Sequence, residues 1–491
     1  MPSITNFSAF GKNDIRGIYS EDITEELYYY VAKAYIKFIQ KKTGEAPKNI
    51  WVSVVKDARL HSESLTSALK KGITHIGANV VDLGLAPTPL GYFSEFCGIP
   101  KSMTDNMNIK GSLIVTASHN PSEYNGLKLT FNKATLTEKE IKEIKELTIE
   151  QIHCDDTAPR HGVSKNFDII PAYIDVMTNT FPGIGKGIKV VVDSANATAG
   201  VVAPKLYREL GCEVIELYSE PDGNFPNHHP NPSDEKTLAD IKAKVIEVGA
   251  DLGIAFDGDS DRIGVIDSKG NYLTGDKLLL IYALDIIKDL AKRGEKLAIV
   301  SEVKCSQVLY DTINESGADA IMCKTGHGFI KSKMKETNAI LAGEMSGHMF
   351  FKDRYYGFDD AIYAGSRIIE IVAKNKLQNP SFKIDDLLVP FSKVHTTSEV
   401  RHHCPNNIKK TVLAKLEKEI ESDKDVFEST IKEIITIDGL RIIFNDGFAL
   451  IRQSNTEPVF TLRFEAKTKK KAESYKKSLI KTLDKCIEAC S

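Results

Sequence analysis

Three stretches that lie far apart in the chain share one pattern: an apolar strand, a polar loop and then an amphipathic helix. They begin at residues 50–55, 188–193 and 297–301. Strands that alternate with helices favour mostly parallel sheets whose faces are covered by helices. The repetition therefore predicts three similar α/β domains in tandem, with mixed, mostly parallel sheets. At 491 residues, the chain is also long enough for several domains.

The C-terminal part of the chain has a different pattern. Residues 433–466 read as several strands with turns at Asp438-Gly439 and at residues 445–447, and helical stretches near 407–422 and 469–489 flank them. This order predicts a smaller α+β domain. Boundaries placed at polar segments and after the acidic loop of residues 257–262 divide the chain into domains of residues 1–160, 161–262, 263–378 and 379–491.

The overall charge argues against a polyanion or membrane-surface binder. Lys and Arg number 64 and Asp and Glu number 67, so the net charge is only −3. We therefore expect no nucleic-acid or membrane partner, and any anion site must be local. Residues 1–20 lack a basic region followed by an apolar run, and the eight cysteines lack paired spacing. These features predict a cytoplasmic protein with reduced thiols.

The strongest chemical motif is Asp257-Gly258-Asp259-Ser260-Asp261-Arg262, which follows the apolar strand 252–256. Three carboxylates so close together repel one another unless a cation neutralises them. A ligand set made only of carboxylates favours Mg²⁺ over zinc. The alternative, an acidic turn that faces water, is disfavoured by the apolar strand beside it.

A second motif is Thr116-Ala117-Ser118-His119-Asn120-Pro121, after the apolar strand 111–115. Catalytic loops of open α/β sheets lie where such strands end. By itself this is a weak signal for a nucleophile, because most loop serines bond to local backbone.

Two glycine-bracketed loops follow in the third predicted domain. Gly343-Glu344-Met345-Ser346-Gly347-His348 combines a carboxylate and a hydroxyl, which suit sugar hydroxyls because those donate and accept hydrogen bonds. The other loop is Lys324-Thr325-Gly326-His327-Gly328. A half-buried strand end with a satisfied histidine remains an equal alternative for the first loop.

The fourth predicted domain contains the loop Arg452-Gln453-Ser454-Asn455-Thr456-Glu457-Pro458 between two strand-like runs. An Arg, two hydroxyls, an amide and loop N–H groups can surround a phosphate. Taken alone, the stretch fits a plain hairpin loop better than a phosphate site.

Two further sequence features lie near the N-terminus. Residues 11–17 form a glycine-bracketed segment with one arginine, Arg16, which alone reads as a surface turn. Asp22 followed by Glu25 predicts a capping box for a helix that ends at Gly44.

Taken together, the four loops at residues 116–121, 257–262, 343–348 and 452–458 resemble those of the α-D-phosphohexomutase family, within its phosphomannomutase/phosphoglucomutase branch. The likeness covers essentially the whole chain. It implies three α/β domains and a smaller fourth domain around a central cleft. One departure is Asn13, where relatives often carry a tyrosine before Asp14-Ile15-Arg16-Gly17; the loss puts a minor substrate contact in doubt.

The resemblance also implies roles for single residues. Ser118 would carry a phosphoryl group, and Asp257, Asp259 and Asp261 would hold Mg²⁺ together with an oxygen of the phosphoserine. Catalytic roles would fall to basic groups around the transferring phosphoryl, and substrate binding to residues of the later loops. The basic groups are Arg16, His119, Lys128 and His348; the substrate-binding residues are Arg262, Lys304, His327, Glu344, Ser346, Arg452, Ser454, Asn455 and Thr456.

The implied reaction interconverts hexose 1-phosphate and hexose 6-phosphate of mannose or glucose. It passes through a phosphoserine enzyme and a hexose 1,6-bisphosphate that is both intermediate and activator. The partners are small-molecule hexose phosphates, and a monomer or weak oligomer is expected. Two alternatives stay open: a mutase of the phosphoglucosamine type and a Mg²⁺-dependent sugar phosphatase. A sugar-phosphate-binding protein without activity is disfavoured, because Ser118, the three aspartates and Lys128 are all present.

Overall fold

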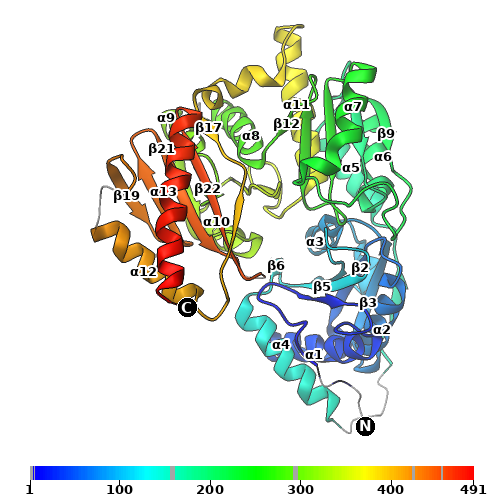
Figure 1. The fold of residues 1–491 in the computed structure, drawn as a ribbon. Coiled ribbons are helices and arrows are strands. Elements are labelled where there is room, and N and C mark those ends of the chain that lie inside the picture. The colour runs from blue at the N-terminus through cyan, green and yellow to red at the C-terminus, as the bar shows by residue number, and fades with distance from the viewer. Residues whose placement is uncertain are drawn as a thin grey trace. The chain divides into compact units, whose positions relative to one another are not determined.

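The computed structural model in Figure 1 describes residues 4, 6–154, 161–290, 297–422, 426–454 and 457–490. The chain divides into two compact units. The first unit comprises Met1–Thr274 and Ser346–Lys383, and the second comprises Gly275–Met345 and Ile384–Ser491. The boundary predicted near residue 160 adjoins residues 155–160, which lie outside the described residues.

The first sheet of the first unit is mixed. Its strand order is β1-β5-β4-β2-β3-β7, with β6 paired to β5. The inner strand β2 runs parallel to β3 and β4, whereas β5 runs antiparallel to β4 and β1. The strands are β1 (Ile15–Ile18), β2 (Trp51–Lys56), β3 (Asn79–Leu85), β4 (Ile109–Val115), β5 (Tyr124–Phe131), β6 (Ala134–Thr135) and β7 (Ser164–Asn166).

Four helices belong to this sheet: α1 (Glu25–Thr43), α2 (Ser62–His75), α3 (Thr88–Phe96) and α4 (Glu138–Ile152). Helix α1 ends at Gly44, as predicted, with Gly44 in the left-handed conformation. The predicted capping box at Asp22 is wrong. The N-cap is Thr24, whose hydroxyl accepts from Leu27 N, because the Asp22 carboxylate instead accepts from the backbone N–H of Ile18.

The second sheet of this unit has the strand order β12-β11-β10-β8-β9. Strand β8 runs parallel to β9 and β10, and β11 turns back antiparallel to β10. The strands are β8 (Lys189–Asp193), β9 (Glu213–Leu217), β10 (Leu252–Phe256), β11 (Ile263–Asp267) and β12 (Tyr272–Leu273). The helices are α5 (Ile170–Thr180), α6 (Ala203–Glu209), α7 (Ala239–Val248) and α11 (Ala361–Gln378), the last of which follows strand β16 (Met349–Phe351).

The second unit contains a parallel array and an antiparallel sheet. In the array, β13 (Ala298–Glu302) lies parallel to both β14 (Asp319–Cys323) and β15 (Leu341–Gly343). Its helices are α8 (Gly275–Leu290), α9 (Gln307–Glu315) and α10 (His327–Thr337). The strand, loop and helix pattern predicted from residue 297 is therefore confirmed.

The antiparallel sheet has the order β17-β22-β21-β20-β19, with β18 also paired to β22. Helices α12 and α13, which are labelled in Figure 1, pack on this sheet through one hydrophobic core, which confirms the predicted α+β domain. The elements are β17 (His395–Thr396), β18 (Val400–His403), β19 (Ile431–Ile435), β20 (Leu440–Phe444), β21 (Gly447–Gln453), β22 (Val459–Ala466), α12 (Lys409–Ser422) and α13 (Lys469–Glu488). Among the residues that the structure describes, no helix combines the length and apolarity that a membrane span needs.

Candidate active site

Ser118 lies in the loop that follows β4 and is 2% exposed. Its backbone has a φ of +52°, in the left-handed region that non-glycine residues seldom occupy. The Ser118 backbone N–H donates to Thr116 Oγ1 at 2.9 Å. Because this conformation is costly for a serine, other contacts must hold the loop in place.

Arg59, which belongs to none of the predicted motifs, supplies those contacts. Its guanidinium is buried and donates to Ser118 O at 2.9 Å and to Asn120 O at 2.6 Å. It also donates to Tyr124 O and pairs with Asp57 at 3.1 Å. The available signal was topological: Arg59 follows β2, which lies beside β4, so both loops leave the same edge of the sheet.

The acidic loop after β10 contacts the serine loop directly. Ser118 Oγ donates to Asp257 Oδ2 at 2.7 Å. A Cβ at Gly258 would lie 2.3 Å from Ser118 O, so only glycine fits at that position. The two loops, which are 139 residues apart at Ser118 and Asp257, therefore meet at one point.

The three predicted aspartates gather within a few ångströms of one another. One carboxylate oxygen from each of Asp257, Asp259 and Asp261 lies within 4.8 Å of the others, and all three residues are buried. Lys128, from β5, donates to Asp259 Oδ2 at 2.6 Å and to Asp261 Oδ2 at 2.5 Å. The positively charged ammonium group of Lys128 thus lies between two of the three carboxylates.

Burial and mutual repulsion give these groups unequal acidity. Burial, and then the charges of Asp261 and Asp259, raise the pKa of Asp257 well above its usual range. Burial would also raise the pKa of Asp261, but the Lys128 and His348 charges outweigh it and lower that pKa well below its usual range. Burial opposes the charge on Lys128, yet Asp259 and Asp261 together raise its pKa well above the usual value.

These residues could hold a metal ion. The ligand atoms are hard carboxylate oxygens, which suit a divalent cation such as Mg²⁺. Among the described residues, Asp259 Oδ1 is buried without a hydrogen-bond partner. A bound cation would give the buried Asp259 Oδ1 a partner. Its charge would also lower the raised pKa of Asp257.

Basic groups surround this cluster within the first unit. His348 Nε2 lies 3.2 Å from Asp261 Oδ1, and Arg262 Nε donates to the same nitrogen at 3.2 Å. His119 Nδ1 lies 3.2 Å from Ser118 Oγ. The Arg262 charge, then burial and Arg16, lower the pKa of His119 well below its usual value, so His119 is neutral at neutral pH.

Arg16 and Ser346 also lie beside these groups. From β1, Arg16 Nη1 donates to Ala117 O at 3.1 Å and to Asn120 Oδ1 at 2.8 Å. The Ser346 hydroxyl lies 3.1 Å from His348 Nδ1. The first unit thus brings together most of the predicted residues: Arg16, Ser118, His119, Lys128, Asp257, Asp259, Asp261, Arg262, Ser346 and His348.

The remaining predicted residues belong to the second unit, where carboxylates hold backbone N–H groups. Glu344 Oε1 accepts from Gly326 N at 2.7 Å, which ties the loop of Glu344 to the loop of His327. Glu302 was not predicted; its Oε1 accepts from Met345 N at 2.8 Å and lies 3.5 Å from Lys304 Nζ.

The predicted phosphate loop begins at the end of β21. Arg452 Nε donates to Asp438 Oδ2 at 3.1 Å. Ser454 Oγ accepts from Glu457 N at 3.1 Å, and Lys409 donates to Ser454 O at 3.1 Å. The predicted residues Asn455 and Thr456 lie outside the described residues.

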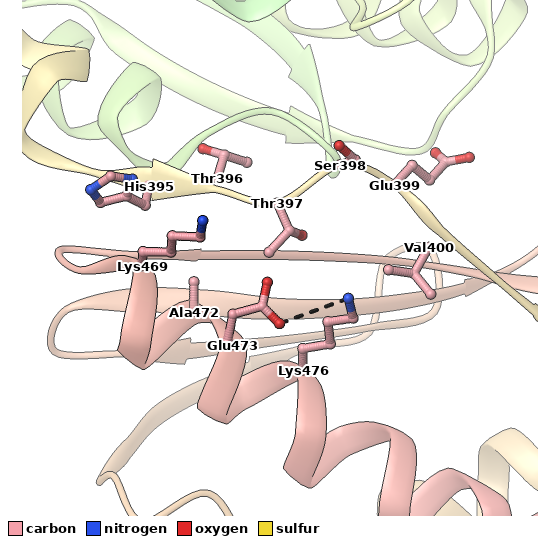
Figure 2. Close-up of a pocket in the computed structure, with 10 residues that line it drawn as sticks. All are labelled: His395, Thr396, Thr397, Ser398, Glu399, Val400, Lys469, Ala472, Glu473 and Lys476. Carbon is pink, nitrogen blue, oxygen red and sulfur yellow. Dashed lines mark ion pairs between the residues drawn. The ribbon is translucent and has the colours of Figure 1, made fainter.

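A separate pocket of about 690 Å³ lies in the second unit (Figure 2). Residues 395–400 form one wall, and Lys469, Ala472, Glu473 and Lys476 of α13 form the other. Glu473 pairs with Lys476 at 3.8 Å. No predicted site residue is among the described residues that line this pocket.

Four parts of the chain match the description phosphoglucomutase/phosphomannomutase: alpha/beta/alpha domain I over residues 8–153, domain II over 171–270, domain III over 274–389 and the C-terminal domain over 399–482.

Individual relatives give the same result. The phosphomannomutase/phosphoglucomutase of Pseudomonas putida is 38% identical over 95% of this chain and 93% of its own. The phosphoglucomutase of Neisseria gonorrhoeae is 39% identical over 95% of both chains. A crystal structure of a phosphoglucomutase/phosphomannomutase family protein from Burkholderia thailandensis superposes with a TM-score of 0.86 at 33% identity, covering 98% of both chains.

Proposed function

Because the chain belongs to the phosphoglucomutase/phosphomannomutase family, we propose that it interconverts the 1-phosphates and 6-phosphates of glucose, mannose or both. The observation that carries this proposal is the 2.7 Å hydrogen bond from Ser118 Oγ to Asp257, beside a cluster of three buried carboxylates. A serine at that position can carry a phosphoryl group next to a divalent cation.

Ser118 acts as a reusable carrier. In the first half-reaction, the bond between phosphorus and Ser118 Oγ breaks and a bond to the free hydroxyl oxygen of the hexose phosphate forms. The hydroxyl proton passes to a basic side chain, the departing Ser118 Oγ takes a proton from an acidic side chain, and the product is a hexose 1,6-bisphosphate. The bisphosphate then turns end for end. The bond between its other phosphorus and the sugar oxygen breaks, a bond to Ser118 Oγ forms, the serine proton passes to a basic side chain and the freed sugar oxygen takes a proton.

The cations of the first unit stabilise the charge of the group in transfer. Asp257, Asp259 and Asp261, with an oxygen of the phosphoserine, would hold Mg²⁺, which would neutralise part of that charge. Arg16, Arg262 and Lys128 lie around the same point and contribute positive charge.

Proton transfer falls to two groups beside the aspartates. Lys128 is protonated while Asp259 and Asp261 hold it, so it suits the acid role. In its neutral form, His348 accepts from Arg262 Nε and lies against Asp261, so that form suits the base role. His119 is neutral and bonds to Ser118 Oγ, so it orients the serine.

The second unit would recognise the rest of the substrate. Glu344 suits sugar hydroxyls, and Lys304 and His327 belong to the loops held beside Glu344. The hydroxyl of Ser346, which belongs to the first unit, also suits a sugar hydroxyl. The non-reacting phosphate would bind at a basic and hydroxyl-rich loop, which comprises Arg452, Ser454, Asn455 and Thr456.

The direct test is mass spectrometry of the purified protein together with a coupled assay. We expect phosphate on the peptide that contains Ser118, and Mg²⁺-dependent formation of glucose 6-phosphate from glucose 1-phosphate with trace bisphosphate. Ser118→Ala should lower turnover by at least roughly 10⁴-fold, as removal of a covalent nucleophile does. The matched control is Ser122→Ala, an exposed serine of the same loop that should keep wild-type activity.

The assay also separates the alternatives. Net release of inorganic phosphate without isomerisation would indicate a phosphatase. Preference for glucosamine or N-acetylglucosamine phosphates would indicate the phosphoglucosamine type. Full activity of Ser118→Ala would mean that another residue carries the phosphoryl group.

Three expectations from the sequence stay predictions: the four-domain division at residues 160, 262 and 378, the monomer or weak oligomer, and the cytoplasmic location.

A further inference from the structure

Asp438 connects two loops of the second unit through one oxygen atom. Asp438 Oδ2 accepts from Arg452 Nε at 3.1 Å and from the backbone N–H of Thr325 at 3.1 Å. The Asp438 side chain is 22% exposed and that of Arg452 is 10% exposed, so solvent screens this pair only partly. Hydrogen bonds to a charged group are the stronger kind.

The backbone places Asp438 there. Asp438 lies in the turn between β19 and β20, and the next residue, Gly439, has a φ of +87°. A Cβ at Gly439 would lie 2.1 Å from Ile451 O and 2.8 Å from Arg452 Cα. The turn is therefore packed directly on the end of β21, in a conformation and a space that favour glycine.

The path of hydrogen bonds from Asp438 continues to Glu344, the carboxylate proposed to bind sugar hydroxyls. Thr325 donates to Asp438, and the next residue, Gly326, donates to Glu344 Oε1 at 2.7 Å. Two consecutive backbone N–H groups thus connect Asp438 to Glu344. Since Asp438 also holds Arg452, one short path of hydrogen bonds joins Arg452 to Glu344.

We propose that Asp438 is a positioning residue that orients Arg452 toward the non-reacting phosphate and sets the separation between that phosphate and Glu344. The inference rests on the proposed mutase function. Asp438 accepts from the Nε of Arg452, so this bond uses neither terminal nitrogen, and those two nitrogens would form the bidentate contact with a phosphate. The negative charge of Asp438 also holds the guanidinium in one orientation when no phosphate is present.

This position has a consequence for both directions of the reaction. The bisphosphate must bind in two orientations, and in each of them one phosphate occupies the loop of Arg452. Loss of Asp438 should therefore weaken binding of the 1-phosphate and of the 6-phosphate alike, and it should change the chemical step less, because that step takes place at Ser118.

The test compares Asp438→Ala and Asp438→Asn with Arg452→Ala and with Glu433→Ala, an exposed carboxylate on the adjacent β19. We expect Asp438→Ala to raise KM for both substrates by roughly 10- to 100-fold, the size of one lost charge-assisted hydrogen bond, while kcat changes less than roughly threefold. Asp438→Asn keeps an acceptor oxygen but loses the charge, so its KM should fall between those of Asp438→Ala and the wild type. Glu433→Ala should match the wild type.

A double variant distinguishes positioning from a general structural effect. If Asp438 acts through Arg452, adding Asp438→Ala to Arg452→Ala should raise KM by less than roughly twofold, because the effects share one path. Additive effects would overturn the inference. If Asp438→Ala does not fold, as judged by circular dichroism, the isosteric Asp438→Asn carries the same comparison.

The outcomes also separate this inference from the proposed function. An inactive wild-type enzyme would mean that the mutase proposal has failed. An active wild type in which Arg452→Ala raises KM but Asp438→Ala and Asp438→Asn do not would overturn only the role of Asp438.

Discussion

The two units use carboxylates in opposite ways. In the first unit, Asp257, Asp259 and Asp261 are buried together and face Lys128 and His348. In the second unit, three carboxylates accept hydrogen bonds from backbone N–H groups of neighbouring loops: those of Glu302, Glu344 and Asp438. At these positions, the carboxylates of the first unit concentrate charge, whereas those of the second unit connect separate loops.

The difference predicts how each unit responds to substitution. Clustered buried carboxylates depend on cations, so changes there should lower turnover or stability strongly. Carboxylates that hold loops act on the position of recognition groups, so changes there should mainly weaken substrate binding.

Among the changes that test this difference between the units, the largest effect should come from Asp259→Asn. This change keeps the shape of the side chain but removes one charge from the candidate metal site, so kcat should fall by roughly 10²- to 10³-fold, as when a transition-state contact is lost. Titration calorimetry should show weaker Mg²⁺ binding. The control, Glu247→Gln on the exposed side of α7, should leave both quantities unchanged. Equal Mg²⁺ affinity in Asp259→Asn and the wild type would contradict the assigned metal site.

The next effect concerns the residue that holds the serine loop. Arg59→Met leaves the buried Asp57 without its cation and removes the donors to Ser118 O and Asn120 O. We expect a loss of about 3–5 kcal/mol in the free energy of unfolding, measured as a lower urea midpoint. Arg208→Met is the control, because its exposed pair with Glu216 is worth about 1 kcal/mol or less. Equal midpoints for the two variants would show that Arg59 does not secure the loop.

A third effect depends on pH. Burial raises the pKa of Asp360, the N-cap of α11, to about 6, although Tyr355, Tyr173 and Tyr363 N donate to it. Between about pH 4 and pH 6, the folded protein keeps a proton that the unfolded chain has lost. Stability should therefore be greatest at the acid end of this window and fall as pH rises through 6, by up to about 3 kcal/mol.

Asp360→Asn should flatten this pH dependence, measured as urea midpoints from pH 4 to pH 7. A slope identical to that of the wild type would mean that Asp360 titrates normally. Because the amide cannot accept both tyrosine hydroxyls in the same way, the comparison uses the slope and not the absolute stability.

The smallest effect should appear in the second unit. Glu344→Gln weakens the bond to Gly326 N, so KM for hexose phosphate should rise roughly tenfold while kcat changes less. Glu336→Gln, on the exposed face of α10, is the control. A large fall in kcat with unchanged KM would contradict the prediction that carboxylates of the second unit act mainly on substrate binding.

Much of the fold could be predicted from local patterns. Apolar runs followed by turn residues indicated β4, β8, β10 and β13, because a buried strand must be apolar along its length. The helix cap at Asp22 could not be settled in this way. Thr24 and Asp22 are both good caps, and the backbone of Ile18 decided between them.

The residues of the candidate site also divide into those that the sequence predicts and those that it does not. The side chains of Ser118 and the three aspartates belong to compact motifs, so their chemistry could be read directly from the sequence. Arg59, Glu302 and Asp438 lie in no such motif, and each acts on atoms far away in the chain. Their contacts are mostly to backbone atoms, which carry no residue-specific signal.

The sequence by itself determined the alternation of strands and helices, the family and the kinds of ligand atoms available. Periodicity and short motifs are local properties, so they survive without coordinates. Only the tertiary structure decided that Ser118 Oγ meets Asp257, that Lys128 lies between Asp259 and Asp261, and that Asp438 joins Arg452 to Thr325. Each of these contacts spans at least 14 residues of chain, and strand pairing and burial, which are not local, bring the partners together.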